Sequence, residues 1–305
     1  MPAVPPAAAL AMPDMVGEAR EASVEGIAVA WSELGSGPAL VLLHGIHDSH
    51  RTWRRIAPVL AQWFRVLMPD LPGHGLSSRP DAPYTLTWYS RIVSAWMDAI
   101  GVATAHLCGH SLGGGIAQWM VLQERHRIDR LALVSPGGLG REVGLGMKYA
   151  AIPYIGPALT PLVVRWGFPL TRWLAPRTFG FMERDEAARL VADFRVPGTD
   201  RAFRRSLESV INLRGQHVRT SDRAGEIEAL PPIALFWGEK DPILPVRHGR
   251  AAVRGSTGIT LTTYPSCGHF PQLEIPAKLA RDIREFLLDP QRPVACITPR
   301  RPAGR

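Results

Sequence analysis

Short apolar runs alternate with segments of helical periodicity along most of this chain, and this alternation most restricts the folds that it can adopt. An alternating run at 24–31 comes first, a continuously apolar run covers 39–43, and mostly apolar, strand-like runs cover 64–68, 105–108, 128–134 and 232–237. Helical spacing is found at 52–62, 86–100, 112–126, 246–254 and 276–288. Strands joined through helices pair in parallel, and apolar strands are covered on both faces. The pattern therefore predicts an α/β fold with a mostly parallel, doubly wound central sheet.

The same alternation divides the chain into segments. Residues 1–22, rich in Ala and Pro and without a basic start, indicate a flexible leader, and residues 290–305 a flexible basic tail. The α/β core is predicted at 23–136 and 231–289. Between them, 137–230 is rich in aromatic residues and shows helical patterns but no convincing strand. We expect it to be a helical cap inserted over one end of the sheet.

Composition excludes several classes of protein. Hydrophobic residues make up 46% and charged residues 20% of the 305 residues, which is typical of a globular chain and not of a disordered one. No apolar run approaches the roughly 18 to 20 residues that span a bilayer. The net charge is +8, but the basic residues are scattered, which disfavours nucleic acid as a partner. Cys108, Cys267 and Cys296 show no disulfide or metal-ligand spacing, which favours a reducing, cytoplasmic location.

The strongest local motif is Gly-His-Ser-Leu-Gly at 109–113, a G-x-S-x-G between a predicted strand and a predicted helix. Such a turn is so sharp that flanking side chains must be minimal, and it exposes the Ser111 hydroxyl at the carboxyl end of the sheet. The first turn of the following helix has unpaired N–H groups, so the Leu112 N–H is a candidate oxyanion donor. An ordinary exposed serine in a glycine-rich turn is the alternative.

With its neighbouring segments, this motif resembles the α/β-hydrolase family over most of the chain. Leu-His-Gly-Ile at 43–46 is similar to the family's oxyanion loop, and the resemblance implies Ile46 as the second oxyanion donor. The run at 68–75 resembles the segment after the family's next strand, and the insertion lies where the family carries a helical cap. The resemblance also implies the order serine, acid, histidine along the chain.

A serine nucleophile needs a base to take its proton and an acid to orient that base. Among the downstream histidines, His269 follows the last predicted strand, and Asp241 follows the run at 232–237 in a turn that resembles the family's acid turn. Strand ends meet at one crevice, so both are expected to converge on Ser111. Glu239 is a competing acid, and a helix-capping role for Asp241 stays open. Asp70 is a further candidate for a displaced acid.

Substrate contacts are expected from His110 and Phe270, which flank the serine and the histidine, and from Trp166 and Trp173 of the insertion. The insertion's aromatic residues are as well suited to a core as to a pocket.

No cofactor and no metal are predicted. The glycines at 137–140 lack the third glycine of a dinucleotide fingerprint. His44, His47, His50 and Asp48 share one short loop without metal-ligand spacing, so we interpret them as loop and oxyanion scaffolding.

Serine in place of aspartate at position 111 disfavours epoxide hydrolysis and dehalogenation. It favours acyl transfer: attack on a carbonyl, an oxyanion held by Ile46 and Leu112, and hydrolysis of an acyl-enzyme by water. The predicted function is hydrolysis of a lipophilic, medium-sized carboxylic ester. Carbon–carbon hydrolysis of ring-cleavage products is the alternative, with a carboxylate-binding arginine available among Arg201, Arg204, Arg205 and Arg214. Cofactor-free perhydrolase activity and a catalytically idle, receptor-like role also stay open.

Overall fold

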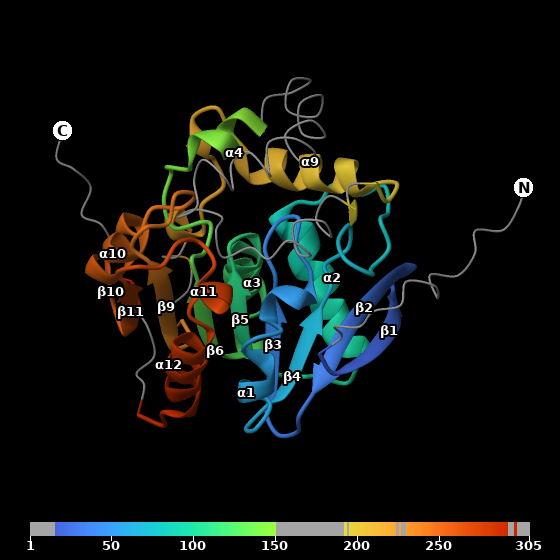
Figure 1. Cartoon of the computed structure of the whole chain (residues 1–305), viewed down its shortest axis with the longest axis horizontal. Helices are drawn as coiled ribbons and strands as arrows, with labels where there is room; N and C mark the ends of the chain where they lie inside the picture. The colour runs from blue at the N-terminus through green and yellow to red at the C-terminus, as the bar shows by residue number, and fades with distance from the viewer. Residues whose placement is uncertain are drawn as a thin grey trace, which may run out of the picture.

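One eight-stranded sheet organises the part of the chain that the computed structural model describes, which is residues 16–150, 192–193, 195–223, 226, 230–291 and 296–297. The strand order is β1-β2-β4-β3-β5-β6-β9-β11 (Figure 1). Neighbours from β4 to β11 pair in parallel, whereas β1 with β2 and β2 with β4 pair antiparallel. The strands are β1 (Glu18–Val24), β2 (Ile27–Leu34), β3 (Ala39–Leu43), β4 (Arg65–Pro69), β5 (Ala105–His110), β6 (Ile128–Val134), β9 (Ile233–Gly238) and β11 (Ile259–Tyr264). The predicted mostly parallel α/β sheet is confirmed.

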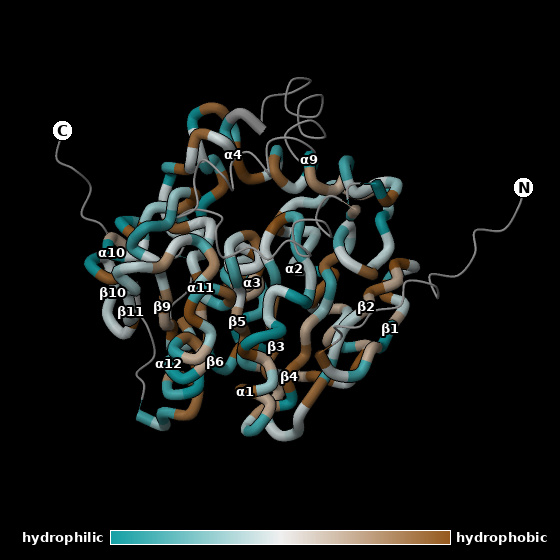
Figure 2. Tube along the Cα trace, in the orientation of Figure 1, coloured by the Kyte–Doolittle hydropathy of each residue, from teal (hydrophilic) through white to brown (hydrophobic). Residues whose placement is uncertain are grey.

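Helices cover both faces of this sheet (Figure 1). In β3, Val41 and Leu43 belong to the core under α2 and α3, while Leu40 and Leu42 belong to the core under α1 and α12. Successive side chains of a strand point to opposite faces, so a strand covered on both faces must be apolar throughout. Figure 2 shows such hydrophobic stretches along β4 and β6. The helices are α1 (Ala57–Leu60), α2 (Leu86–Ala99), α3 (Leu112–Glu124), α10 (Arg247–Arg254), α11 (Pro271–Glu274) and α12 (Pro276–Leu288).

The start of the described chain differs from the prediction. A single strand at 24–31 after a leader that ends at residue 22 is wrong, because β1 and β2 form a hairpin that begins at Glu18. Glu25 and Gly26 have φ values of 50° and 77°, as a two-residue hairpin turn between twisted strands requires. Most of β1 is exposed at the sheet edge. Backbone pairing with β2, rather than an apolar pattern, therefore makes this segment a strand.

Two further segments depart from the prediction. The helix expected over 52–62 is divided into a 3₁₀ turn, η1 (His50–Trp53), and the short α1, which has Pro58 in its first turn. Proline lacks an N–H and fits only the beginning of a helix, so the helix restarts there. The tail expected to be flexible over 290–305 contains β12 (Cys296–Ile297), which pairs antiparallel with β10 (Ser256–Thr257).

The described part of the insertion holds α4 (Leu145–Ala150), α9 (Thr199–Val210) and the 3₁₀ turn η4 (Thr220–Asp222). In Figure 1, α4 and α9 lie above the end of the sheet at which β5 and β9 finish. The prediction of no strand in 137–230 is wrong at β7 (Ile211–Asn212) and β8 (Gly215–Gln216), which form a two-residue hairpin pair. These strands are too short to show the alternation of apolar and polar residues by which a strand is predicted from sequence.

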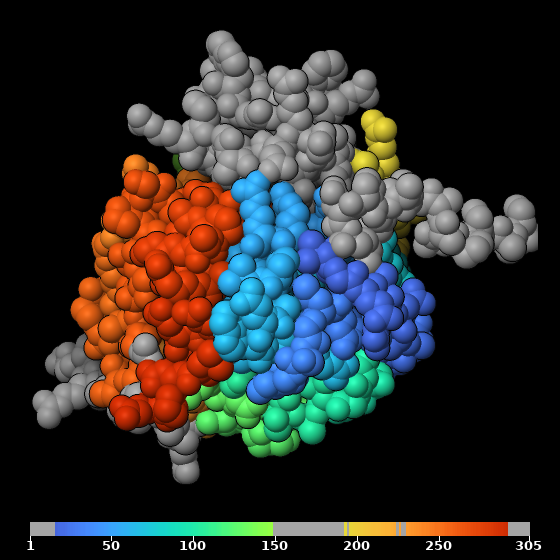
Figure 3. All heavy atoms as spheres, turned by 60° about the horizontal axis from the view of Figure 1, so that its bottom comes forward, coloured from blue at the N-terminus to red at the C-terminus, as the bar shows by residue number. Residues whose placement is uncertain are grey.

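The fold also brings the last described helices beside the segment that follows β3. In Figure 3 the C-terminal residues, in orange to red, lie against the light-blue segment that contains α1. The Gln272 side chain donates to the Thr52 hydroxyl at 3.0 Å, and Arg55 donates to the Leu273 carbonyl at 2.9 Å. The loops that follow β3 and β11 are thereby fixed to each other. No described helix combines the length and the apolar composition that crossing a bilayer needs.

Candidate active site

Ser111 occupies a strained turn between β5 and α3. Its φ is 51° and its ψ is −114°, a region that residues with a side chain rarely adopt. A Cβ on Gly109 would lie 2.5 Å from the Gly113 carbonyl oxygen, and one on Gly113 would lie 2.3 Å from the Leu43 carbonyl oxygen. Both glycines are therefore required for the close approach of strand, helix and β3. The strain holds the serine hydroxyl away from the backbone, in the position that the G-x-S-x-G motif predicts.

Asp241 and His269 form a buried pair beyond the ends of β9 and β11. The His269 Nδ1–H donates to Asp241 Oδ2 at 2.8 Å, and the Asp241 side chain is fully buried. Asp241 Oδ1 accepts the N–H groups of Ile243 and Leu244, at 2.8 and 2.9 Å. The indole of Trp237 also donates to Oδ2, at 3.2 Å. Four donors thus fix the orientation of this carboxylate.

His110 connects this pair to the serine. Its Nε2–H donates to the carbonyl oxygen of His269 at 2.9 Å, and the two rings lie 4.9 Å apart between centroids. Burial keeps the pKa of His110 well below its usual value, so the ring is neutral. Since His110 immediately precedes Ser111, the contact brings His269 next to the nucleophile candidate. In the described part of the chain no hydrogen bond joins the His269 ring to the Ser111 hydroxyl, a contact that often closes only when substrate binds.

The loop after β3 presents the second predicted oxyanion donor, Ile46, beside Ser111 and Leu112. His44, at its start, is fully buried; its Nδ1–H donates to the Gly45 carbonyl at 2.7 Å, and its Nε2 accepts the Leu71 N–H at 2.9 Å. These two contacts fix one neutral tautomer, and burial lowers the pKa of the ring. The Gly45 carbonyl and the Ile46 N–H belong to one peptide group, in which they point in opposite directions. His44 therefore sets the direction of the Ile46 N–H.

A second buried acid–histidine pair supports the same loop. Asp70 accepts the His50 backbone N–H at 2.7 Å, its ring Nδ1–H at 3.0 Å and the Leu76 N–H at 2.8 Å. Burial alone would raise the pKa of Asp70, but the His50 ring and these hydrogen bonds outweigh it and lower the pKa to about 2. The Asp70 carboxylate is hydrogen-bonded to the His50 ring and not to His269, so it is not a displaced acid of the candidate site. The described residues contain no group of His, Cys, Asp or Glu arranged to hold a metal ion.

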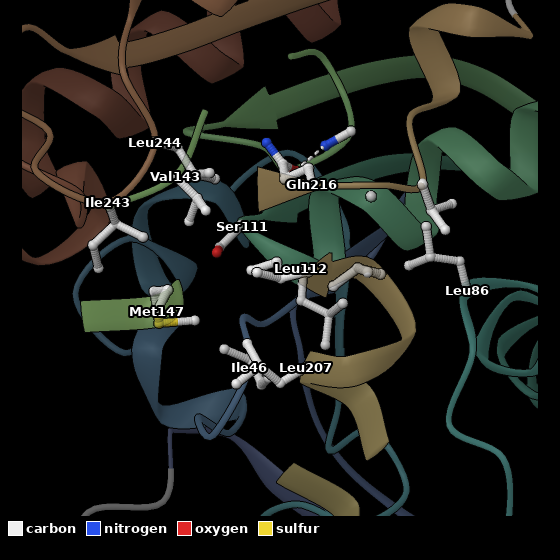
Figure 4. Close-up of a pocket in the computed structure, with 16 residues that line it drawn as sticks. Ile46, Leu86, Ser111, Leu112, Val143, Met147, Leu207, Gln216, Ile243 and Leu244 are labelled. Atoms are coloured by element: carbon white, nitrogen blue, oxygen red, sulfur yellow. Dashed lines mark hydrogen bonds between the residues drawn. The ribbon is translucent and has the colours of Figure 1, made fainter. Parts of the chain in front are cut away.

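An apolar cavity, partly open to solvent, lies over Ser111. Figure 4 shows the Ser111 hydroxyl pointing into it. Gln216 is the other polar side chain among the described lining residues, and its amide already bonds the Gly138 N–H and the Gly140 carbonyl. No described lining residue is charged. The apolar side chains of the lining are Ile46, Leu86, Leu112, Val143, Met147, Leu207, Val210, Ile211, Val218, Ile243 and Leu244.

Two of the predicted substrate-binding residues, His110 and Phe270, are not among the described residues that line this cavity. His110 is buried under His269, and Phe270 packs on His110 with ring centroids 5.0 Å apart. Both rings pack against His269, because the end of β5, which carries His110, meets the loop after β11, which carries His269 and Phe270. Trp166 and Trp173 lie outside the described residues. The competing acid Glu239 bonds Arg250 at 3.0 Å and is not a partner of His269.

Apart from Ser111, Ile46 and Leu112, sequence reasoning did not find the residues that line the cavity. Val143 and Met147 come from the segment that ends in α4, Leu207 from α9, and Ile243 and Leu244 from the loop after Asp241. Their sequence signal is only apolar character, which core residues share. The Trp237 donor to Asp241 was also not predicted, because its indole direction depends on tertiary packing.

Comparison with known proteins identifies the family of this chain. A model of the alpha/beta hydrolase family matches residues 40–282, which include all three candidate catalytic side chains. The chain belongs to the α/β-hydrolase family. The resemblance expected from the sequence is thereby confirmed, and with it the fold.

Relatives of this α/β hydrolase differ in what they act on. An uncharacterized protein of Mycobacterium tuberculosis is 35% identical over 89% of this chain and 81% of its own length. The 2-hydroxy-6-oxo-6-phenylhexa-2,4-dienoate hydrolase of Burkholderia cepacia is 30% identical over 88% of this chain and 93% of its own. A crystal structure of a bacterial membrane phospholipase A superposes with a TM-score of 0.69 at 26% identity, covering 88% of this chain and 85% of that one. Both ester and carbon–carbon bond hydrolases are therefore among its relatives.

Proposed function

We propose that this α/β hydrolase cleaves lipophilic carboxylic esters through a Ser111–His269–Asp241 triad. The observation that carries the proposal is an uncharged cavity with the Ser111 hydroxyl pointing into it and the buried His269–Asp241 pair beside it. An ester presents a neutral carbonyl with apolar groups on both sides, which suits this lining.

In the proposed reaction, His269 Nε2 takes the Ser111 proton as the hydroxyl oxygen attacks the ester carbonyl. Asp241 holds the ring with its proton on Nδ1, the tautomer that leaves Nε2 free to accept. The N–H groups of Ile46 and Leu112 stabilise the tetrahedral oxyanion. His269 then protonates the leaving alcohol, which leaves the acyl group on Ser111. In the second half of the reaction, His269 takes a proton from a water molecule that attacks the acyl-enzyme, and then returns a proton to the Ser111 oxygen.

The cavity favours esters over the substrates of carbon–carbon hydrolases. The dienoate named for the Burkholderia cepacia relative carries a carboxylate, and a buried carboxylate needs a paired cation. Three of the four arginines considered for that role bind elsewhere: Arg201 donates to the Arg79 carbonyl, Arg204 pairs with Glu208, and Arg205 pairs with Asp81. The fourth, Arg214, is exposed next to the tip of the β7–β8 hairpin. None of them is among the described lining residues.

A substrate panel tests this choice. We expect a fluorophosphonate to label Ser111, and neutral aryl and alkyl esters to turn over faster than dienoic diketones by at least about tenfold, because the diketone carboxylate would enter the cavity unpaired. Measurements of kcat/KM over the panel provide the comparison. Faster cleavage of the diketones would overturn the ester assignment in favour of carbon–carbon hydrolysis.

The geometry of His44 leads to a second prediction for the same reaction. His44→Asn keeps a donor near the position of Nδ1, whereas His44→Gln keeps an acceptor near Nε2 and loses the contact with the Gly45 carbonyl. If that contact aims the Ile46 N–H, His44→Gln is expected to lower kcat by about 10²-fold, the usual effect of losing an oxyanion donor, with KM little changed. His44→Asn is expected to lower kcat less than His44→Gln does. Steady-state kinetics of both variants check this, and equal losses would contradict the role.

A further inference from the structure

Two leucines are far more exposed than apolar side chains normally are. Leu145, at the start of α4, is 69% exposed, and Leu213, at the tip of the β7–β8 hairpin, is 61% exposed. They are the two most exposed large apolar side chains of the described part of the chain. Single exposed leucines need no explanation, but two on one surface mark an interaction site.

The two leucines lie on neighbouring elements of one surface. Helix α4 packs against β7, and Figure 1 shows α4 beside the loop region that follows α9. The residues before α4 are joined to the hairpin, since the Gln216 N–H donates to the Arg141 carbonyl at 2.8 Å. The Arg141 guanidinium in turn donates to the Arg214 carbonyl at 3.2 Å. We call Arg141, Leu145, Leu213 and Arg214 the α4–hairpin surface.

The charge of the α4–hairpin surface is positive. Arg141 and Arg214 are exposed, and neither forms an ion pair with a carboxylate in the described part of the chain. The nearest acid in sequence, Glu142, is already engaged by His248 at 2.6 Å and by Arg247 at 3.3 Å. Two arginines that form no ion pair among the described residues, beside two exposed leucines, fit a partner that is anionic at its surface and apolar beneath it.

The elements that carry this surface also contribute to the cavity over Ser111. Val143 and Met147 flank Leu145 in sequence and line the cavity, while Ile211 and Gln216 do so at the base of the hairpin. Met147 and Ile243 are half-buried and lead from the exposed side toward the lining. The elements that carry the exposed leucines therefore also form part of the wall of the cavity.

We propose that the α4–hairpin surface docks this protein on an anionic phospholipid bilayer, with Leu145 and Leu213 inserted among the acyl chains and Arg141 and Arg214 at the phosphates. Such docking would bring the elements that line the cavity close to the bilayer, which would supply lipophilic substrate. That delivery of substrate rests on the proposed ester hydrolysis, whereas the docking itself does not.

Vesicle binding tests the docking without turnover. The full chain carrying Ser111→Ala is mixed with vesicles of equimolar phosphatidylcholine and phosphatidylglycerol, and with vesicles of phosphatidylcholine alone, and is then sedimented. We expect binding to the anionic vesicles that weakens as salt is raised, because surface charges are screened within about 10 Å at 0.1 M salt. Leu145→Ser with Leu213→Ser is expected to weaken binding about tenfold or more. Arg141→Gln and Arg214→Gln are expected to weaken it roughly fivefold each.

Leu288→Ser is the matched control, because Leu288 is 46% exposed at the end of α12, on the opposite side of the molecule from α4 (Figure 1). It is expected to bind like the parent. The proposal is overturned if the chain does not sediment with anionic vesicles, if binding survives the double leucine variant, or if Leu288→Ser weakens it equally. A chain that binds vesicles but hydrolyses no ester would contradict the proposed function and leave the docking intact.

Discussion

Ser111→Ala is expected to lower kcat/KM for ester hydrolysis by roughly 10³- to 10⁶-fold, the largest effect of any single substitution in this protein. The substitution removes the atom that would form the acyl-enzyme. It removes little else, because the Ser111 hydroxyl makes no hydrogen bond in the described part of the chain. Alanine also retains a Cβ, so the backbone strain at a φ of 51° is unchanged. We therefore expect the thermal midpoint of unfolding to stay close to that of the parent.

Ser135 provides a matched control for this variant. It follows β6, has a φ of 43°, is buried, and its hydroxyl is also without a partner, yet it is absent from the described cavity lining. Ser135→Ala is expected to retain the parent's rate. Initial rates on an aryl ester and labelling by a fluorophosphonate measure both variants. Full activity of Ser111→Ala would refute the assignment of the nucleophile.

The apolar strands and the nucleophile turn could be predicted because their physical cause is local. A run such as Leu40 to Leu43 must be apolar at every position when two cores cover it. Gly109 and Gly113 are required because a Cβ at either position would lie less than 3 Å from a backbone atom, and both glycines are part of the G-x-S-x-G motif. The predicted order of strands and helices and the proximity of Asp241 to His269 follow from the same rule, that parallel strand ends share one edge.

Features that depend on long-range contacts could not be predicted. The exposed side chains of β1 carry no apolar pattern, and only pairing with β2 makes it a strand. The tautomer of His44 is set by Leu71, which lies on another loop. The cavity lining could not be distinguished from core, because an apolar side chain in α9 such as Leu207 serves both: it is buried, packs in a core cluster and lines the cavity. The sequence predicts which residues are apolar, but only packing decides what they face.

Asp241→Asn is expected to lower kcat by roughly 10⁴-fold with little change in KM, for a reason that the hydrogen bonds specify. Oδ1 accepts two backbone N–H groups, from Ile243 and Leu244. The asparagine carbonyl must take that position, since the reverse orientation would set its NH₂ group against both donors. The NH₂ group then faces His269 Nδ1 and donates to it. The imidazole is forced to carry its proton on Nε2, where it cannot accept the proton of Ser111.

Glu239→Gln is the matched control for this variant. Like Asp241→Asn, it replaces a carboxylate with an amide, and Glu239 is the competing acid two residues before Asp241. Glu239 bonds the exposed Arg250 and no group of the candidate site, so the change is expected to alter kcat less than about threefold. Comparing the two variants therefore distinguishes the effect on kcat of removing a negative charge from this turn from the effect of changing the tautomer of His269. Steady-state kinetics on one aryl ester measure both, with circular dichroism as the check on folding. A large loss in Glu239→Gln together with a small loss in Asp241→Asn would assign the acid to Glu239 instead, because only the residue that orients the ring can produce the larger effect.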